Sequence, residues 1–434
     1  MRFLGYEKKL FKLAINGDTM RKKILVKGPA LTRSGYGEQC RFALRALRKY
    51  EEFFDIYLEP LNWGQTGWLA DDTEERNWMD GLVGKTIVHH QGKGQFDISL
   101  QVTIPQEWDN LAPVNIGYTA GTETTKISGQ WIEKANVMDK IITVSDHTKH
   151  AFENSTYDVI DNKTGEKKSG FRCVTPLHTV NFATRNIEPS KLDVDFEYDF
   201  NFLIVAQFGI RKNLENTIKW FVEEFKNDEV GLVVKTNLAK NCLMDREAVM
   251  GKMKLLTERT PDTKCKVYLL HGDMTDEEIH SLYHHPRLKA MISLPHGEGF
   301  GLPMFEAAYS GMPVIATGWS GQLDYLVDEH QKEQFYNVSY DIQPIQDQAL
   351  WEGVLVKEAM WSYPKESSAK TQMRRCYEDV RDNRGQAPKS RAYAQELHER
   401  FSEEKMLALF ADEVHKPDPE ISEWLSKLEA LEEL

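Results

Sequence analysis

The stretch Ser293–Glu306, S-L-P-H-G-E-G-F-G-L-P-M-F-E, guides the interpretation of the whole second half of the chain. An apolar strand pattern ends at Leu294, glycines follow at positions 297, 299 and 301, and Pro303 stands where a helix would begin. A strand, a glycine-rich turn and a helix start leave backbone N–H groups free to bind an anion. Glycine also lets the backbone approach a phosphate closely. The pattern therefore predicts an anion-binding turn.

Two carboxylates accompany this turn, Glu298 before the helix and Glu306 within its first turns. A carboxylate accepts hydrogen bonds from the neighbouring hydroxyls of a sugar. Two of them beside a phosphate-binding helix start suit a nucleotide sugar, one for the hexose or pentose and one for the ribose. The alternative for Glu306 alone is a carboxylate that caps or solvates a helix.

The spacing from Glu298 to Glu306 resembles the E-x7-E signature of the retaining glycosyltransferases of the GT-B fold, family four. The run E-G-F-G-L-P-M-F-E-A-A-Y-S-G-M-P-V-I-A-T is similar to that family almost position for position, and the likeness continues through Val267–Ile279 and Phe202–Asn213. The resemblance implies an α/β chain of GT-B architecture, with two Rossmann-like domains, a cleft between them and C-terminal helices. It also implies retaining transfer of a sugar from a nucleoside-diphosphate donor to a hydroxyl acceptor.

Roles for single residues follow from this resemblance. It implies that Glu298 contacts the hydroxyls of the donor sugar, that Glu306 holds the ribose and that Lys212 neutralises the leaving diphosphate. A fixed cation favours the transition state because the departing group gains negative charge. The family has an arginine where this chain has Gln207. Arg211 could supply the missing charge, and the alternative is an exposed side chain at a helix start.

Further donor-side residues are taken from the same resemblance. They are Gly299, Phe300, Gly301, Leu302, His271, Met274, Thr317, Ser320 and Gly321. The family binds the diphosphate without a metal, so the resemblance implies no metal and no cofactor beyond the nucleoside-diphosphate sugar as co-substrate. The D-x-D pattern at Asp193–Asp195 lies in an acidic, turn-rich stretch away from any predicted strand end and is not assigned to a metal.

The first half carries two more glycine loops after predicted strands. Lys23–Lys27 predicts a strand, and the loop after it resembles the family's acceptor and phosphate loop through Ser34, Gly35, Tyr36 and Gly37. A second loop, Gly117–Thr124, resembles a branch found in bacteria and phages. Many relatives carry a catalytic histidine at that strand end, and this chain has none. Thr119 or Glu123 is the candidate for its place, and the alternative for Glu123 is a loop acid that caps a helix.

Strand patterns alternate with helical patterns along the chain, which predicts parallel sheets. We expect a short strand at Thr86–His89, a hairpin or loop insert at Asp161–Arg172, an interdomain linker at Asn186–Asp199 and a helical tail from about Gln348. The predicted parts are a basic amphipathic N-terminal extension (1–20), an acceptor domain (21–190), a nucleotide-sugar domain (200–390) and C-terminal helices (391–434). One arrangement open to the C-terminal helices is that they cross back to the first domain.

Composition sets the class of protein and its surroundings. The five cysteines are scattered and odd in number, which argues against a disulfide framework and favours a reducing cytoplasm. No apolar run is long enough to span a membrane. The net charge is −13, yet the first 50 residues hold thirteen Lys or Arg against three acids. A basic start on an acidic body predicts an anionic partner, a membrane or DNA, and the alternative is a solvated helix face with a frayed end.

The acceptor and the function class have alternatives. A cell-envelope glycan or lipid suits a cytoplasmic enzyme that sits peripherally at the membrane, and a modified base of phage DNA would use the same basic end for phosphates. A non-catalytic nucleotide-sugar or nucleic-acid binding protein that keeps the fold is the competing class, supported by Gln207 and the missing histidine. The sequence does not determine the oligomeric state.

Overall fold

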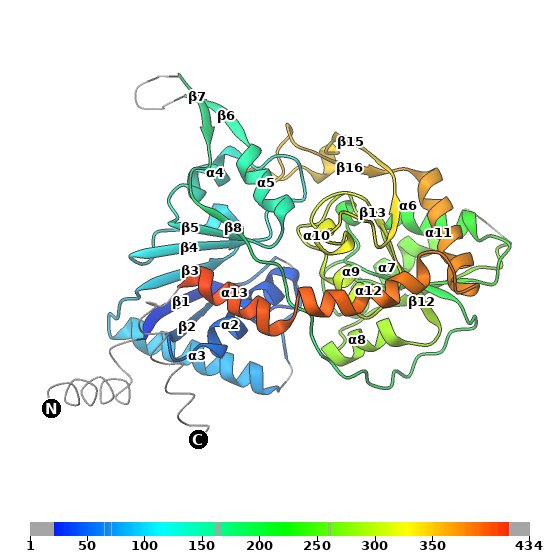
Figure 1. The fold of residues 1–434 in the computed structure, drawn as a ribbon, viewed down its shortest axis with the longest axis horizontal. Coiled ribbons are helices and arrows are strands. Elements are labelled where there is room, and N and C mark those ends of the chain that lie inside the picture. The colour runs from blue at the N-terminus through cyan, green and yellow to red at the C-terminus, as the bar shows by residue number, and fades with distance from the viewer. Residues whose placement is uncertain are drawn as a thin grey trace.

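The computed structural model describes residues 21–64, 66–70, 72–160, 165, 167–258, 260 and 262–415. They form two lobes, each with its own sheet at the centre (Figure 1). The expected N-terminal extension (1–20) and the last part of the expected C-terminal helices (416–434) lie outside the described residues, as do nine further positions within the chain.

The first domain is built on a six-stranded parallel sheet in the order β2-β1-β3-β4-β5-β8. Its central strands are apolar on both faces, as expected for a sheet covered by helices on both sides. In β1, for instance, Ile24, Leu25 and Val26 are all buried. The strands are β1 (Lys22–Gly28), β2 (Phe54–Pro60), β3 (Ile98–Val102), β4 (Val114–Thr119), β5 (Lys140–Thr143) and β8 (Leu177–Thr179). The helices are α2 (Gly35–Lys49), α3 (Glu74–Gln91), α4 (Gly129–Ala135) and α5 (Asp146–Asn154), with a 3-10 turn at Pro105–Glu107.

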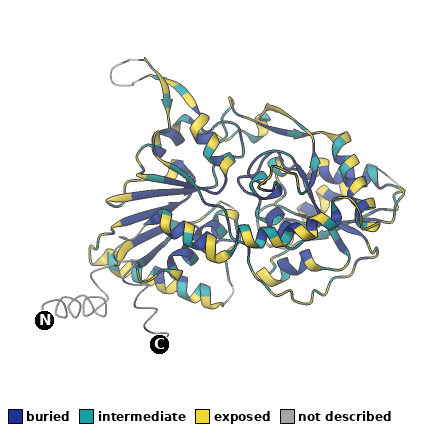
Figure 2. Ribbon diagram, in the orientation of Figure 1, coloured by how far each residue is buried: buried dark blue, intermediate teal, exposed yellow. Residues whose placement is uncertain are grey.

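The second domain repeats the plan with the strand order β11-β10-β9-β12-β13-β14. Its strands are β9 (Asn201–Val205), β10 (Gly231–Lys235), β11 (Lys266–Leu270), β12 (Leu288–Ser293), β13 (Val314–Thr317) and β14 (Tyr336–Val338). Its helices are α6 (Leu214–Glu224), α7 (Leu243–Thr257), α8 (Asp276–His284), α9 (Leu302–Tyr309) and α10 (Leu323–Leu326), with a 3-10 turn at Ile210–Lys212. Thr275 and Glu278 form the expected capping box of α8. In both lobes the sheet is buried and the outer helix faces are exposed (Figure 2).

Two hairpins and three helices complete the chain. The hairpin of β6 (Thr156–Ile160) and β7 (Lys167–Arg172) projects from the first domain (Figure 1). A second hairpin, β15 (Tyr340–Pro344) and β16 (Met360–Pro364), extends from the second domain with a 3-10 turn at Asp347–Ala349 in its long connection. The helices are α11 (Glu366–Arg381), α12 (Ala387–Arg400) and α13 (Glu403–Val414). Helix α13 returns to the first domain, where Phe410 packs against Phe42 of α2 with ring centroids 5.5 Å apart.

Two of the expected elements are wrong. Thr86–His89 lies inside α3, where the Thr86 hydroxyl donates to the Leu82 carbonyl one turn earlier, and Ile87 and Val88 face solvent. The β-branched residues suggested a strand, but the helix context overrides this propensity. The tail is not helical from Gln348, because β16 pairs antiparallel with β15 and the helices begin only at Glu366.

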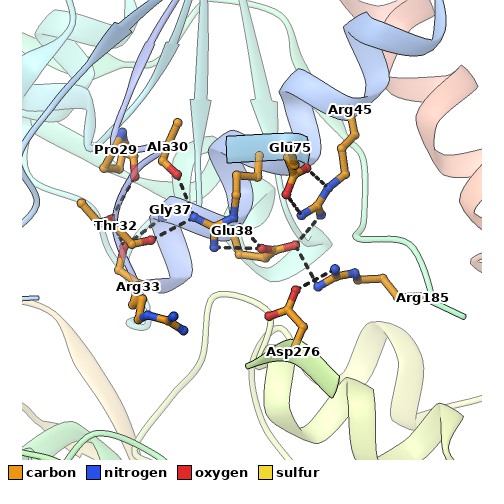
Figure 3. A network of polar contacts seen from close by, with 12 residues as sticks. Pro29, Ala30, Thr32, Arg33, Gly37, Glu38, Arg45, Glu75, Arg185 and Asp276 are labelled. Atoms are coloured by element: carbon orange, nitrogen blue, oxygen red, sulfur yellow. Dashed lines mark hydrogen bonds and ion pairs between the residues drawn. The ribbon is translucent and has the colours of Figure 1, made fainter. Parts of the chain in front are cut away.

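The segment between β8 and β9, which contains the expected linker Asn186–Asp199 and is called the linker below, lacks regular structure and is held by ion pairs. Arg185 binds Asp276, the first residue of α8, at 2.7 Å and approaches Glu38 of α2 at 3.7 Å (Figure 3). Glu38 also binds Arg45 at 2.6 Å, and Arg45 binds Glu75 of α3 at 2.5 Å. A continuous series of ion pairs therefore runs from the first domain through the linker to the second.

Burial in the second domain predicts how its stability responds to mutation. Leu282 of α8 is 0% exposed and Leu255 of α7 is 65% exposed. We expect Leu282→Ala to lower the free energy of unfolding by about 2–5 kcal/mol, because it leaves a cavity. Leu255→Ala, the matched control, should change it by less than about 0.5 kcal/mol. Urea denaturation measures both, and equal losses in the two variants would contradict this placement of the core.

Candidate functional site

The glycine turn lies between β12 and α9, as the sequence predicts. Gly301 is the N-cap of α9 with φ +90°, a left-handed conformation that favours glycine, and Pro303 follows within the first turn. In the first turn of α9, Pro303 has no N–H and the Met304 N–H donates to the Gly301 carbonyl at 3.0 Å, so an anion would be bound by the N–H groups of Leu302 and the glycine turn.

Two cations converge on Glu298 beside this turn. Its Oε1 accepts from Lys212 Nζ at 2.5 Å, and its Oε2 accepts from Arg211 Nη1 at 3.1 Å. The backbone places both cations, because the Arg211 carbonyl accepts from His296 N–H at 2.8 Å. Asn213, next in the chain, donates its side-chain amide to the Leu294 carbonyl at 3.1 Å. The structure therefore brings Glu298, Lys212 and Arg211 together.

The charged groups of this cluster shift one another's pKa values. Burial by itself would raise the pKa of Glu298, but Lys212 and Arg211 outweigh it and hold the pKa below its usual value. Burial, with repulsion from Arg211, lowers the pKa of Lys212 despite the attraction of Glu298. Burial opposes the charge of Arg211, yet Glu123 and Glu298 raise its pKa. Glu298 is therefore a carboxylate at neutral pH.

Glu123 joins the cluster from the first domain. Its Oε1 lies 3.1 Å from Arg211 Nη2. The loop that carries it lies directly on the glycine turn: a Cβ added to Gly299 would meet the Ala120 carbonyl oxygen at 2.6 Å, and one added to Gly297 would meet that of Glu123 at 2.4 Å. Glycine is therefore required at both positions for the two domains to make this contact.

The predicted acceptor loop is tied to the same place. The Tyr36 hydroxyl is hydrogen-bonded to Thr119 Oγ1 at 2.8 Å and accepts from the Ala120 N–H at 3.2 Å. Ser34 caps α2 by accepting from the Gly37 N–H at 2.9 Å. A Cβ on Gly37 would meet the Thr32 carbonyl at 2.1 Å, whereas Gly35 has nothing within 4 Å.

Glu306 does not join the Glu298 cluster. It faces a cavity of about 20 Å³ between the domains, lined by residues of α2, the linker, α9 and α13 that include Arg45, Arg185 and Leu302. Its Oε2 accepts from the Tyr283 hydroxyl at 2.9 Å. Burial raises the pKa of Glu306 to about 7. Both glutamates lie at the junction of the two domains, but in separate surroundings.

Several of the residues predicted to bind the donor hold the backbone of the glycine turn in place. The Ser320 hydroxyl accepts from the Glu298 N–H at 2.9 Å, and Gly321 donates to the Glu298 carbonyl at 3.0 Å. The Thr317 hydroxyl donates to the Pro295 carbonyl at 3.3 Å. The Phe300 ring packs in the core against Phe305, with centroids 5.1 Å apart, so Phe300 offers only its backbone to a ligand.

The predicted base-binding turn after β11 presents little side-chain chemistry. His271 Nε2 lies 2.9 Å from Asp245 Oδ1, and Asp245 also accepts from the backbone of the loop after β10. Gln207 donates to the Leu238 carbonyl at 2.5 Å and stays outside the Glu298 cluster. The Met274 carbonyl accepts from Arg33 of the first domain at 3.0 Å.

Sequence analysis missed the hairpin β15–β16 as part of the site. Ser362 donates its N–H and its hydroxyl to the His296 carbonyl at 2.9 and 2.8 Å, and Trp361 stacks on the His296 ring with centroids 4.8 Å apart. The hairpin also binds the first domain: the Met360 carbonyl accepts from the Thr125 N–H at 2.8 Å, and the Gly353 carbonyl accepts from Ser128 at 2.7 Å. No local pattern announces such long-range pairing.

A histidine near the site was missed as well. His147, in the first turn of α5 after β5, packs edge-to-face on Trp319 with centroids 4.8 Å apart. Its Nε2 is buried without a hydrogen-bond partner, and burial lowers its pKa to about 4. From the sequence, the family's catalytic histidine was expected at the end of β4, which is the strand next to β5.

The described residues hold neither a cluster of metal ligands nor a helix that could span a membrane. They include no group of three or more His, Cys, Asp or Glu arranged to hold a metal ion. In the D-x-D pattern, Asp195 is exposed and binds Arg287 at 2.6 Å. Within the same residues, none of the helices combines the length and the apolar character needed to cross a bilayer.

The raised pKa of Glu306 predicts how stability depends on pH. Between its ordinary value of 4.5 and about 7 the folded protein binds a proton that the unfolded chain releases, so stability falls as pH rises through that window. Glu306→Gln should remove this loss, and its Tm advantage over the wild type should grow up to about pH 7 and then level off. Thermal melts from about pH 5 to 8 measure it, with exposed Glu133→Gln as control. Parallel Tm curves for Glu306→Gln and wild type would contradict the assignment.

Comparisons with known proteins agree with this architecture. Residues 194–348 match the family model described as "Glycosyl transferases group 1". No curated protein matches the sequence.

Solved structures with the same fold are distant in sequence. The Anabaena protein HepE in complex with UDP and glucose is 13% identical, with a TM-score of 0.57 over 92% of this chain and 100% of that one. A glycosyltransferase from Rickettsia africae is 14% identical, with a TM-score of 0.55 over 92% and 100%. Sucrose-phosphate synthase from Thermosynechococcus elongatus is 13% identical, with a TM-score of 0.55 over 95% and 100%.

The expected two-domain α/β architecture is confirmed, with a parallel sheet in each domain and helices at the C-terminal end. The chain has the GT-B fold, and its second domain carries the match to the group 1 glycosyl transferases.

Proposed function

We propose that the protein is a retaining, metal-independent glycosyltransferase that moves a sugar from a nucleoside diphosphate to a hydroxyl acceptor. The observation that carries this proposal is the convergence of Lys212 and Arg211 on Glu298 at the N-terminus of α9. Two cations and a helix start are groups that bind a diphosphate, and a carboxylate beside them can bind sugar hydroxyls.

Each residue has a role in the proposed reaction. The amides of the turn from Gly299 to Leu302 and the cations Lys212 and Arg211 bind the diphosphate. Glu298 orients the sugar, and Glu306 binds the ribose from the adjoining cavity. Arg211 supplies the charge that Gln207 lacks, since its guanidinium lies in the Glu298 cluster. Thr119 and the Ser34–Gly37 loop border the acceptor side.

The chemistry is positioning with charge stabilisation. The acceptor oxygen bonds to the anomeric carbon on the face from which the diphosphate leaves, the bond from that carbon to the diphosphate oxygen breaks, and the leaving phosphate takes the acceptor proton. Lys212 and Arg211 stabilise the negative charge that grows on the leaving group.

The competing proposal is a protein that binds a nucleotide sugar without turnover. It draws on Gln207, which bonds to the Leu238 carbonyl instead of entering the cluster. A panel of nucleotide sugars in a thermal-shift screen identifies the donor. Donor binding with no transfer to any pool of acceptors would favour this alternative.

Substitution in the cluster tests the catalytic proposal. Glu298→Gln and Lys212→Ala should each lower turnover by about 10²-fold or more, because each removes a charge that acts on the transition state. Lys219→Ala is the matched control, since that lysine lies on the outside of α6, where it pairs with Glu223 at 3.8 Å. Donor hydrolysis and sugar transfer measure the rates, and circular dichroism checks the fold. Unchanged rates in both cluster variants would remove the assignment.

The acceptor is tested by comparing two anionic surfaces. The first 50 residues are strongly basic, whereas the whole chain carries −13, which disfavours extended contact with DNA. We expect the full chain to bind vesicles rich in phosphatidylglycerol more strongly than a duplex DNA, with both interactions weaker at higher salt. Co-sedimentation and gel shift at about 50 and 200 mM salt measure this. Stronger retention on DNA would favour a modified base as the acceptor.

A further inference from the structure

Arg211 is shared between carboxylates of the two domains. Its Nη2 lies 3.1 Å from Glu123 Oε1 of the first domain, and its Nη1 lies 3.1 Å from Glu298 Oε2 of the second. The same Nη1 donates to the Gly297 carbonyl at 2.8 Å. Three acceptors, two of them carboxylates, therefore already occupy the guanidinium in the empty site.

The cluster is balanced in charge. It contains two cations, Arg211 and Lys212, and two carboxylates, Glu123 and Glu298. A diphosphate that enters a balanced cluster meets no net positive charge, because the two carboxylates offset the two cations. Binding therefore requires that one carboxylate leave its cation.

The two carboxylates are not equally easy to displace. Glu298 is held by two cations, its side chain is 9% exposed, and its backbone is fixed within the glycine turn by Ser320 and Gly321. Glu123 has one ion pair, its side chain is 20% exposed, and it lies in an irregular loop between β4 and α4. Glu123 is the weaker partner of the two.

The loop of Glu123 also covers the anion-binding turn. The Ala120 carbonyl oxygen lies 2.6 Å from where a Cβ of Gly299 would be, and the Glu123 carbonyl oxygen lies 2.4 Å from where a Cβ of Gly297 would be. A phosphate that approaches the amides of this turn meets the same loop. Charge and sterics thus point to a single movement, in which the loop lifts and Glu123 leaves Arg211.

We propose that Glu123 is a displaceable internal anion: it occupies Arg211 in the empty site, and the donor diphosphate takes its place as the first-domain loop lifts from the glycine turn. This inference rests on the proposed function, and it gives Glu123 a role in donor binding in place of the catalytic role expected from the sequence. Donor affinity is then set by competition between a carboxylate of the first domain and a phosphate for one guanidinium.

The test measures the affinity for inorganic pyrophosphate, a probe that does not depend on the base or the sugar. Glu123→Gln should bind pyrophosphate at least about five-fold more tightly than wild type, because the competing charge is gone. The exposed Glu133→Gln of α4 is the matched control and should bind like wild type. The gain should vanish in the background Arg211→Gln, where Glu123→Gln has no guanidinium to release. Isothermal titration calorimetry of the full-length proteins measures the pyrophosphate affinity of each variant and of the wild type. UDP, GDP and ADP serve as further probes.

The outcomes separate the two proposals. Equal or weaker pyrophosphate binding by Glu123→Gln would overturn the displacement, and so would an unchanged affinity accompanied by a loss of turnover, which is the pattern of a catalytic carboxylate. A gain that persists without Arg211 would overturn it too. Tighter pyrophosphate binding in a protein that binds no nucleoside diphosphate would keep the displacement and defeat the proposed donor.

Discussion

The close approach of two backbones at the glycine turn is the constraint on which the rest of the site depends. Gly297 and Gly299 lie against carbonyl oxygens of the first-domain loop at distances that leave no room for a side chain. This contact places the N-terminus of α9, the Glu298 carboxylate and the Arg211 and Lys212 cations at one point on the domain boundary. A side chain at either glycine would separate the domains where the chemistry is proposed to occur.

The domain arrangement is maintained on several sides of this point. Arg185 in the linker joins α2 to α8 through Glu38 and Asp276 (Figure 3). Helix α13 packs its Phe410 on the first domain. Asp324 of α10 accepts from the Asp146 N–H at 3.0 Å and from Asn181 at 2.8 Å, which adds a polar contact across the boundary. The site therefore belongs to the pair of domains and not to one of them.

Structural features that depend on residues close together in the chain could be predicted from the sequence. The glycine turn, the helix start at Leu302, the capping box at Thr275 and the alternation of strands and helices follow from spacing and residue type, and the structure has them. The strand expected at Thr86–His89 failed because β-branched residues also occur on exposed helix faces, where tertiary context decides. The direction of the Arg211 side chain could not be predicted from the sequence. It depends on Glu123 and Glu298, which are both more than 80 residues away in the chain, and Glu123 belongs to the other domain.

The hairpin β15–β16 links the glycine turn to the first domain. Ser362 in β16 binds the carbonyl of His296, the residue just before the first glycine of the turn, and Met360, two residues earlier, accepts from Thr125 of the first domain, while Gly353 in the connection accepts from Ser128. Hinged separation of the lobes must therefore either peel this arm from α4 or pull on His296. Motion between the two domains is in this way transmitted to the glycine turn, so the hairpin would influence the rate of any step that requires the domains to separate.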